Sequence, residues 1–324
     1  MSESEFTDDR EQLLDNHKRM YSRDEVLKCP HMMNLLGYLN LNHGLPKSGW
    51  LNDGLRYHYT DASGLLGIIQ SSRLWASDIR FLNDPSEGTF FPERLLAIMD
   101  SQSSGRRGAG QKVIEGLKAS LQNPRSDYSA FCVSLSANGD LLSQWRAYGS
   151  FGKGYAVGLD FGLKSILPHP QLAGYYDVVY GDKGLVDIAI DLLDLFISAT
   201  DKWKDMMYDE WSSTLRAIAK SFKDASYSEE QESRLVCHYS GEDNDLFKNE
   251  LPLKFRAKGS DLIPYIPLSL DLLEAENKPR LPMKRIVVGP GVDFKRNYAS
   301  INSLLKVNSY ADVEVVPSTI PFRP

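Results

Sequence analysis

The pattern of apolar and polar residues changes near residue 55. Residues 55–60 (Leu-Arg-Tyr-His-Tyr-Thr) are rich in strand-forming residues, and the apolar residues that follow predict a helix over 62–71 and a short strand over 73–77. The more polar residues before them, with an N-cap signal at 21–27, indicate a helical lead-in. The pattern therefore predicts an N-terminal helical extension over 1–50 and a mixed domain over 51–324.

The later elements come in irregular groups. Helices are expected near 85–100, 111–121, 140–148 and 296–305, and a long block with helical spacing of apolar residues covers 183–222. Strands are expected near 128–136, 154–161, 175–181, 232–239, 252–257, 262–268, 284–289 and 312–316. Because strands and helices do not alternate strictly, we expect an α+β fold with a mixed, mainly antiparallel split sheet and a helical insertion at about 183–222.

Composition narrows the class of protein without naming a function. The chain has 324 residues, 42% of them hydrophobic, which is enough for a full core. Its 37 Lys and Arg against 43 Asp and Glu indicate no bulk attraction to nucleic acid or to an anionic membrane. The acidic first residues and the lack of an apolar run near the roughly 18 residues of a membrane span predict a cytoplasmic protein with no membrane partner. Three widely spaced cysteines are expected to be reduced thiols.

Several polar residues occupy positions where a strand would bring them together. His58 and Thr60 are two residues apart, so both side chains leave the same face of the strand at 55–60. Ser134 and Ser136 share this spacing, and so do Glu230 and Glu232 if that segment is extended. Each also has an ordinary structural interpretation: a core histidine bonded to a backbone carbonyl, strand polarity, or a solvated acidic run.

Six blocks of the sequence carry a family resemblance. The chain resembles the bacterial domain of unknown function 2971 over about residues 55–324. The blocks are His58-Tyr59-Thr60, Leu74-Trp75-Ala76-Ser77, Asn83-Asp84-x-x-Glu87, Trp145-x-x-Tyr148-Gly149, Glu230-x-Glu232-x-Arg234 and Ser318-x-Ile320-Pro321-Phe322-Arg323. The layout of His58-x-Thr60, Ser134-x-Ser136 and Glu230-x-Glu232 also resembles, more weakly, that of ADP-ribosyltransferases.

The second resemblance implies an NAD-consuming enzyme. It would transfer ADP-ribose to a macromolecular acceptor, protein or nucleic acid, or hydrolyse NAD, as a bacterial toxin or antiviral-defence effector. Glu232 would stabilise the oxocarbenium-like ribose, and Glu230 would help to activate the acceptor. His58 would bind the ribose hydroxyls, Arg56 would pair with the pyrophosphate, and Ser134 and Ser136 would reach the ribose. The side chains expected to stack on the nicotinamide ring are Tyr59, Trp145 and Tyr148, and Thr60 would lie on the NAD-binding strand.

Two other functions remain open. A metal-dependent nuclease would use carboxylates such as Asp78, Asp84 and Glu87. Alternatively, the family blocks build the core of a non-catalytic sensing or interaction module, with Trp145 and Tyr148 as core residues and Asp84 and Glu87 as a helix cap. The enzyme hypothesis requires His58 and Glu232 to converge on opposite walls of one cavity sized for a dinucleotide.

Overall fold

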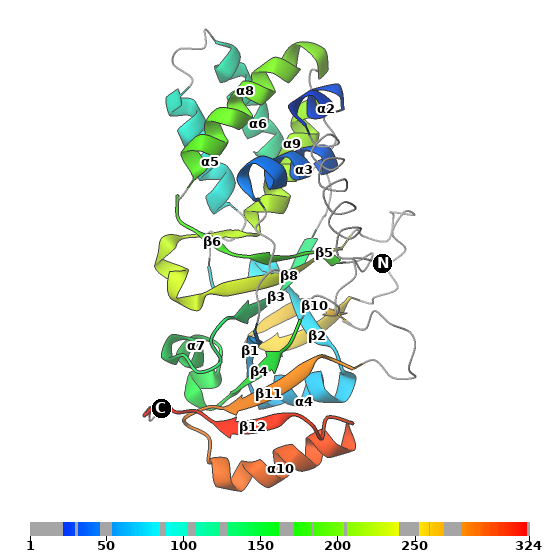
Figure 1. The fold of residues 1–324 in the computed structure, drawn as a ribbon, viewed down its shortest axis with the longest axis vertical. Helices are drawn as coiled ribbons and strands as arrows, with labels where there is room; N and C mark the ends of the chain where they lie inside the picture. The colour runs from blue at the N-terminus through cyan, green and yellow to red at the C-terminus, as the bar shows by residue number, and fades with distance from the viewer. Residues whose placement is uncertain are drawn as a thin grey trace, which may run out of the picture. The chain divides into compact units, whose positions relative to one another are not determined.

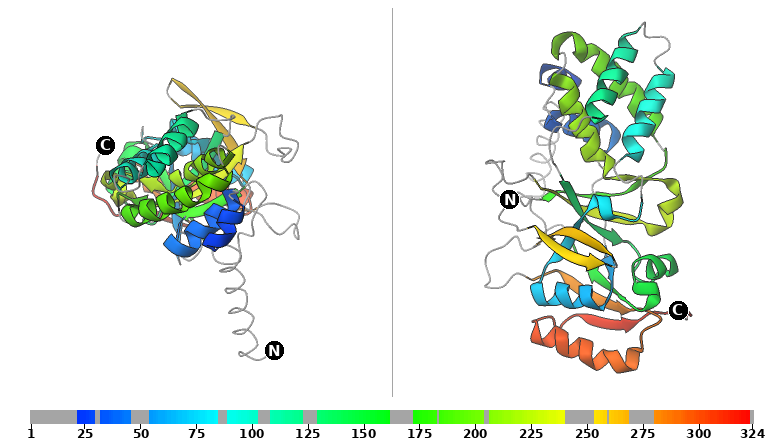
Figure 2. Two further views of the ribbon diagram at one scale, coloured as in Figure 1. Left: turned by 90° about the horizontal axis from the view of Figure 1, so that it is seen from above. Right: turned by 180° about the vertical axis from the view of Figure 1, so that it is seen from behind.

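The protein consists of two compact units, each assembled from three segments of the chain. The helical unit comprises residues 1–47, 86–127 and 179–225, and the sheet unit comprises residues 48–85, 128–178 and 226–324. Figure 1 shows the elements of both units, and Figure 2 gives two further views. The computed structural model describes residues 22–29, 32–45, 54–84, 89–102, 108–122, 129–161, 172–182, 184–203, 206–239, 253–258, 260–268 and 280–322.

The helical unit buries apolar stripes from all three of its segments in one core. Its described elements are α2 (Arg23–Lys28), α3 (Met32–His43), α5 (Phe90–Gln102), α6 (Ala109–Gln122), α8 (Leu185–Trp203) and α9 (Met206–Ala219), with the short parallel pair β6 (Val179–Tyr180) and β7 (Phe222–Lys223). Phe196 stacks on Trp211 with ring centroids 3.5 Å apart, and Phe91 stacks on Phe222 at 4.3 Å. Such buried aromatic pairs contribute both area and specific geometry to the core.

This division differs from the predicted one. We expected residues 1–50 to be an extension and 183–222 to be an insertion into a single domain. Instead, Leu35 and Leu39 of α3 are fully buried in the same core as α8 and α9, together with α5 and α6. The physical reason is that each amphipathic helix must cover its apolar face, and these helices cover one another.

The sheet unit confirms the predicted α+β class, with a mixed and mostly antiparallel sheet. Its described strands run in the order β12-β11-β4-β1-β3-β2-β10-β9, with β8 paired to β3 and β5 paired to β8, and among these strands only β11 and β12 pair in parallel. The strands are β1 (Arg56–Thr60), β2 (Leu74–Asp78), β3 (Ser129–Ser136), β4 (Tyr155–Leu159), β5 (Leu172–Asp177), β8 (Glu232–Tyr239), β9 (Lys254–Lys258), β10 (Asp261–Leu268), β11 (Met283–Val288) and β12 (Glu314–Pro317). The α-helices of this unit are α4 (Ala62–Ser71), α7 (Leu142–Ala147) and α10 (Phe294–Val307).

The sheet opens along β3. One edge of β3 pairs with β8 over its whole length, from Ser129 to Ser136. The other edge is shared: β1 pairs with it at Ser136, whereas β2 pairs with it at Phe131 and Cys132. Because β1 and β2 occupy opposite ends of the same edge, the ladder is interrupted between them.

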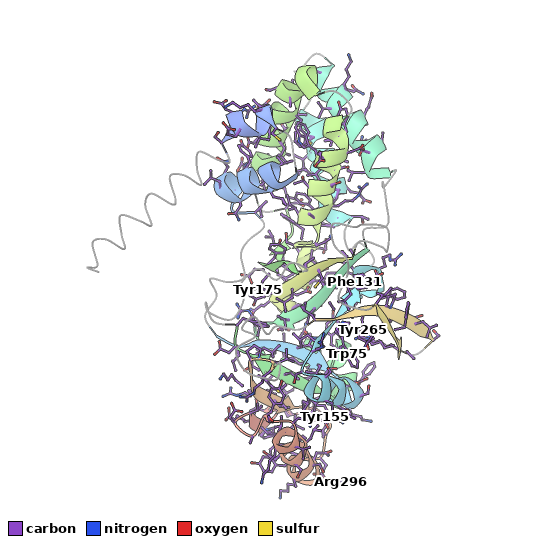
Figure 3. The ribbon with its side chains drawn as sticks, turned by 90° about the vertical axis from the view of Figure 1, so that its right-hand side faces the viewer. Trp75, Phe131, Tyr155, Tyr175, Tyr265 and Arg296 are labelled. Atoms are coloured by element: carbon purple, nitrogen blue, oxygen red, sulfur yellow. The ribbon has the colours of Figure 1, made fainter. Side chains whose placement is uncertain are left out.

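Two cores flank this sheet. The larger core includes Phe131, Tyr155 and Tyr175, which Figure 3 labels, together with residues of α4 and α10. The smaller core contains Tyr57, Tyr59, Trp145, Ala156 and Val287 and lies beneath α7. Alternation along β1 explains this division, because Tyr57 and Tyr59 are buried on one face while Arg56, His58 and Thr60 leave the other.

The structure bears on the expected lack of a membrane span and on the state of the cysteines. Within the described ranges, no helix combines the length and apolarity that crossing a bilayer requires. Cys29 is an exposed free thiol, and Cys132 and Cys237 are buried free thiols.

Candidate functional site

A pocket in the sheet unit gathers residues from four separated segments of the chain. Its cavity volume is about 60 Å³, far below the roughly 300–1,000 Å³ of typical ligand pockets, and about 360 Å³ when the open space at the mouth is included. It is smaller than the cavity for a whole dinucleotide that we expected. The lining residues are Tyr57, His58, Tyr59, Ser134, Leu135, Ser136, Gln144, Tyr148, Glu230 and Glu232.

His58 bridges the opening in the sheet. Its Nδ1 lies 3.0 Å from the carbonyl oxygen of Ser134, a residue of β3 between the positions that pair with β1 and β2. Burial lowers the pKa of His58 and the nearby Arg256 lowers it further, which outweighs the Ser134 hydrogen bond. The imidazole is therefore neutral near pH 7, and because a carbonyl only accepts, Nδ1 carries the proton. Nε2 is then left as a hydrogen-bond acceptor.

Glu232 is held by an arginine from its own strand. Arg234 donates from Nε to Oε1 at 2.8 Å and from Nη2 to Oε2 at 2.9 Å. The side chains are only 1% and 5% exposed for Arg234 and Glu232, respectively. Residues two apart on a strand share a face, so the sequence Glu-x-Arg places this pair side by side. A buried, bidentate pair of this kind fixes the orientation of the carboxylate.

Glu230 reaches the same pocket through a different backbone conformation from the one we expected. The segment is not extended: Glu230 ends a 3₁₀ helix, and Gln231 has φ of 44° before Glu232 begins β8. A positive φ at a residue with a side chain is a strained conformation that is often found at functional sites. This turn aims the two carboxylates at different partners, and both still line the pocket.

Hydrogen bonds tie Glu230 to the opposite wall. Tyr148 donates to its Oε1 at 3.0 Å, and Ser136 Oγ donates to its backbone oxygen at 2.9 Å. Burial raises the pKa of Tyr148, and the charges of Glu230 and Glu232 raise it further. The phenol therefore stays protonated and remains a donor to the carboxylate.

Asp140 fixes the short helix that carries Tyr148. It accepts from Trp145 Nε1 at 2.8 Å, from Ser318 Oγ at 2.5 Å and from the backbone nitrogen of Thr319 at 2.7 Å. Burial raises the pKa of Asp140, but these hydrogen bonds lower it more, so the net pKa lies below the ordinary value. The last family block, which begins at Ser318, thus anchors the wall of the pocket.

Three of the predicted NAD-binding residues do not line the pocket. Arg56 donates to Ser233 Oγ at 3.3 Å, a polar contact away from the pocket lining. Thr60 is partly buried on the opposite face of β1 from Tyr59. Trp145 is completely buried, with its ring edge on Tyr59, so it supports the wall and does not stack on a ligand. Trp145 is therefore a core residue, as the alternative prediction had it, because its Nε1 donates to Asp140 and its ring is fully buried.

A second aromatic group lies on β2 and β10. Trp75 and Tyr265 have ring centroids 5.0 Å apart, and Figure 3 shows them on neighbouring strands. The Arg256 guanidinium lies 5.6 Å from the Trp75 ring and donates to Ser77 Oγ at 2.8 Å. This cation–π stack closes β2 onto the β9–β10 hairpin.

The carboxylates proposed for a nuclease do not form a described cluster. Asp78 is buried and accepts two hydrogen bonds from Arg80 Nε, at 3.0 and 3.1 Å. Asp84 is also buried, and Pro85, Ser86 and Glu87, with the predicted capping box, lie outside the described residues. Across the described part of the chain, no group of three or more His, Cys, Asp or Glu side chains is arranged to hold a metal ion.

Sequence reasoning missed Gln144 and Arg234, as well as Tyr57 and Leu135 in the pocket lining. Gln144 on α7 lines the pocket, yet an isolated glutamine in a short helix carries no motif. Arg234 belongs to a family block, and its alternation with Glu232 was a usable signal for the ion pair.

Comparison with known proteins gives a family match over part of the chain. Residues 144–235 match the model described as "Protein of unknown function (DUF2971)". This match supports the predicted family resemblance over residues 144–235. The DUF2971 segment includes Gln144, Tyr148, Glu230 and Glu232 of the pocket, whereas His58 precedes it. No curated protein and no solved structure matches the chain, so the resemblance to ADP-ribosyltransferases stays a prediction.

Proposed function

We propose that the sheet unit binds the nicotinamide–ribose end of NAD in this pocket and breaks the bond between them. The observation that supports this most is the shared pocket lining: His58, Ser134, Ser136, Tyr148, Glu230 and Glu232, selected from the sequence for this chemistry, all border it. The cavity itself is small, so the nicotinamide and ribose would occupy its open mouth, with the adenosine half extending beyond it. Substrate and product would be NAD and free nicotinamide.

The chemistry is a displacement at the ribose anomeric carbon. The C1′–N1 bond breaks and its electron pair neutralises the pyridinium nitrogen, while an oxygen from water or from a macromolecular acceptor bonds to C1′. Positive charge on the ribose is stabilised by Glu232 and Glu230. Glu230, the less buried of the two carboxylates, accepts the proton that the attacking oxygen loses.

His58 and Tyr148 position the sugar in this mechanism. The neutral His58 offers Nε2 as an acceptor for a ribose hydroxyl, because Nδ1 is committed to Ser134. Tyr148 holds the Glu230 carboxylate in one orientation. We therefore expect a His58→Ala change to weaken NAD binding, and a Glu232→Gln change to slow the chemical step more than binding.

The test is nicotinamide release from NAD by the purified full-length chain. We expect release by the wild type, a loss of more than about tenfold in Glu230→Gln and Glu232→Gln, and no change in Glu229→Gln. Glu229 is the matched control because it is exposed on the same 3₁₀ helix. No release by the wild type, or equal release by all three variants, would refute the proposal.

Transfer of ADP-ribose to a macromolecule, or a toxic role, would begin with the same breaking of the C1′–N1 bond of NAD. If a protein or nucleic acid is the acceptor, radiolabelled ADP-ribose becomes attached to it, whereas hydrolysis gives free ADP-ribose. Overproduction is then expected to arrest bacterial growth, and Glu232→Gln is expected to restore it. If growth arrest persists in both Glu230→Gln and Glu232→Gln, the toxicity does not depend on NAD cleavage in this pocket.

One observation favours a non-catalytic interaction module as a second candidate. The two oxygens of Glu232 are bonded by Arg234, which is an arrangement that a purely structural ion pair would also adopt. In that case NAD is not consumed, and Glu232→Gln lowers stability only. The nicotinamide assay and the unfolding experiment described in the Discussion separate the two candidates.

A further inference from the structure

Gln144 is a buried amide that opens onto the candidate pocket. It lies in α7, only 6% of the residue is exposed, and it borders the pocket beside Tyr148, four residues later on the same helical face. Its backbone oxygen is occupied, because it accepts from the backbone nitrogens of Tyr148 at 2.9 Å and Gly149 at 3.1 Å. Only its side-chain amide remains to be accounted for.

That side-chain amide has no protein partner among the described residues. Its pocket neighbours differ in this respect: Tyr148 donates to Glu230, and Ser136 donates to the Glu230 backbone. The indole of the adjacent Trp145 donates to Asp140. The described side-chain atoms that are sealed from solvent without a partner are Ser143 Oγ and Trp211 Nε1, so the Gln144 amide is open to the pocket, where a bound group can complete its hydrogen bonds.

The chemistry of the pocket defines what this group is. A primary amide offers one acceptor oxygen and two donor hydrogens, so its best planar partner is another primary amide, which forms two antiparallel hydrogen bonds. The other walls supply aromatic surface from Tyr57 and Tyr59 for a flat ring. Glu230 and Glu232 disfavour a carboxylate at the same place, because like charges repel.

We propose that Gln144 recognises the carboxamide of nicotinamide and sets the specificity of the pocket for aromatic carboxamides. The inference rests on the proposed function and adds a substrate-binding residue to it. The Gln144 oxygen accepts from the carboxamide nitrogen, and the Gln144 nitrogen donates to the carboxamide oxygen. The nicotinamide ring then lies against the tyrosine walls, and the ribose faces Glu230 and Glu232.

The first experiment uses NAD and its 3-acetylpyridine analogue, in which a methyl group replaces the amide nitrogen. Both ligands are neutral at this group and nearly equal in size, so they differ chiefly in the hydrogen bond to the Gln144 oxygen. We expect the wild type to prefer NAD in kcat/KM by about tenfold to hundredfold, and Gln144→Met to reduce the preference to about twofold or less. Arg146→Met, an exposed change on the same helix, is the control that keeps the preference.

The second experiment measures binding without turnover. Calorimetric titration of free nicotinamide and of 3-acetylpyridine reports the same hydrogen bond when no NAD is consumed. If nicotinamide release is absent but the wild type still prefers nicotinamide and Gln144→Met does not, the proposed function fails and the carboxamide site stands. If the variant unfolds, the wild-type preference alone decides. Equal affinity of the wild type for both ligands, no binding of either, or an unchanged preference in a folded Gln144→Met would overturn the inference.

Discussion

The buried pair of Glu232 and Arg234 allows a quantitative test of how the site is held. Replacing Glu232 with Gln keeps the shape of the side chain but leaves the Arg234 guanidinium, 1% exposed, without its carboxylate. Breaking a buried ion pair from one side costs about 3–5 kcal/mol. Arg234 has further interactions besides this pair, so we expect a loss of about 3 kcal/mol in the free energy of unfolding.

The double variant Glu232→Gln/Arg234→Met isolates the pair. Removing both charges leaves neither ion uncompensated, so the double variant is expected to lose about 2 kcal/mol less than the sum of the single variants. Equilibrium urea unfolding followed by circular dichroism measures each value. The control is Glu314→Gln, because the Glu314 side chain is 54% exposed and bonds Arg285 at 2.6 Å. Removal of this surface pair is expected to cost less than about 1 kcal/mol.

The result bears directly on how catalytic variants are interpreted. If Glu232→Gln lies within about 0.5 kcal/mol of the wild type, or if the single losses add up in the double variant, the reasoning about a buried pair is wrong. If the loss is about 3 kcal/mol, domains of ordinary stability remain folded at 20 °C, since they start from about 5–15 kcal/mol. Activity lost under those conditions then reflects chemistry.

Two further changes test the geometry around the pocket. Burial lowers the folded-state pKa of His58, so as the pH falls below about 6.5 the unfolded chain binds a proton before the folded chain does, and the free energy of unfolding decreases. Urea titrations from pH 7 to 5 are expected to show a smaller decrease for His58→Asn than for the wild type. The same dependence on pH in both proteins would contradict this prediction. Gln231 has φ of 44°, so Gln231→Val is expected to lower the free energy of unfolding by about 1–2 kcal/mol, whereas Gln231→Gly leaves it unchanged or raises it. A higher urea midpoint for Gln231→Val than for Gln231→Gly would show that the turn is not strained.

Local patterns predicted the elements well. The helix expected over 62–71 is α4, Ala62–Ser71, and the strands expected near 232–239 and 262–268 are β8 and β10. These segments have strong periodicity and clear ends, such as Asp61, whose side chain accepts from the Gly64 backbone at the start of α4. The grouping of helices into one unit was not predictable in this way, because it depends on which apolar faces meet across more than 100 residues.

The candidate site was predictable where residue chemistry is distinctive. His58 and Glu232 line one pocket because β1 and β8, which carry them, both pair with β3, and Glu230 joins them from the 3₁₀ helix that precedes β8. Arg56 and Trp145 were assigned by residue type, and packing directs them to Ser233 and Asp140 instead. Gln144 has no distinctive neighbours in the sequence, and only the absence of a described partner in a buried position makes it notable.

The interleaving of the two units has a consequence for how the chain is made. The chain passes from one unit to the other near residues 47, 85, 127, 178 and 225, so neither core can close while early parts leave the ribosome. Residues of α2 and α3 are buried only once α8 and α9 have been synthesised, and β11 acquires its partner β12 later still. During that interval apolar faces stay exposed, so nascent chains of this protein are expected to depend on chaperones until these partner elements have been synthesised.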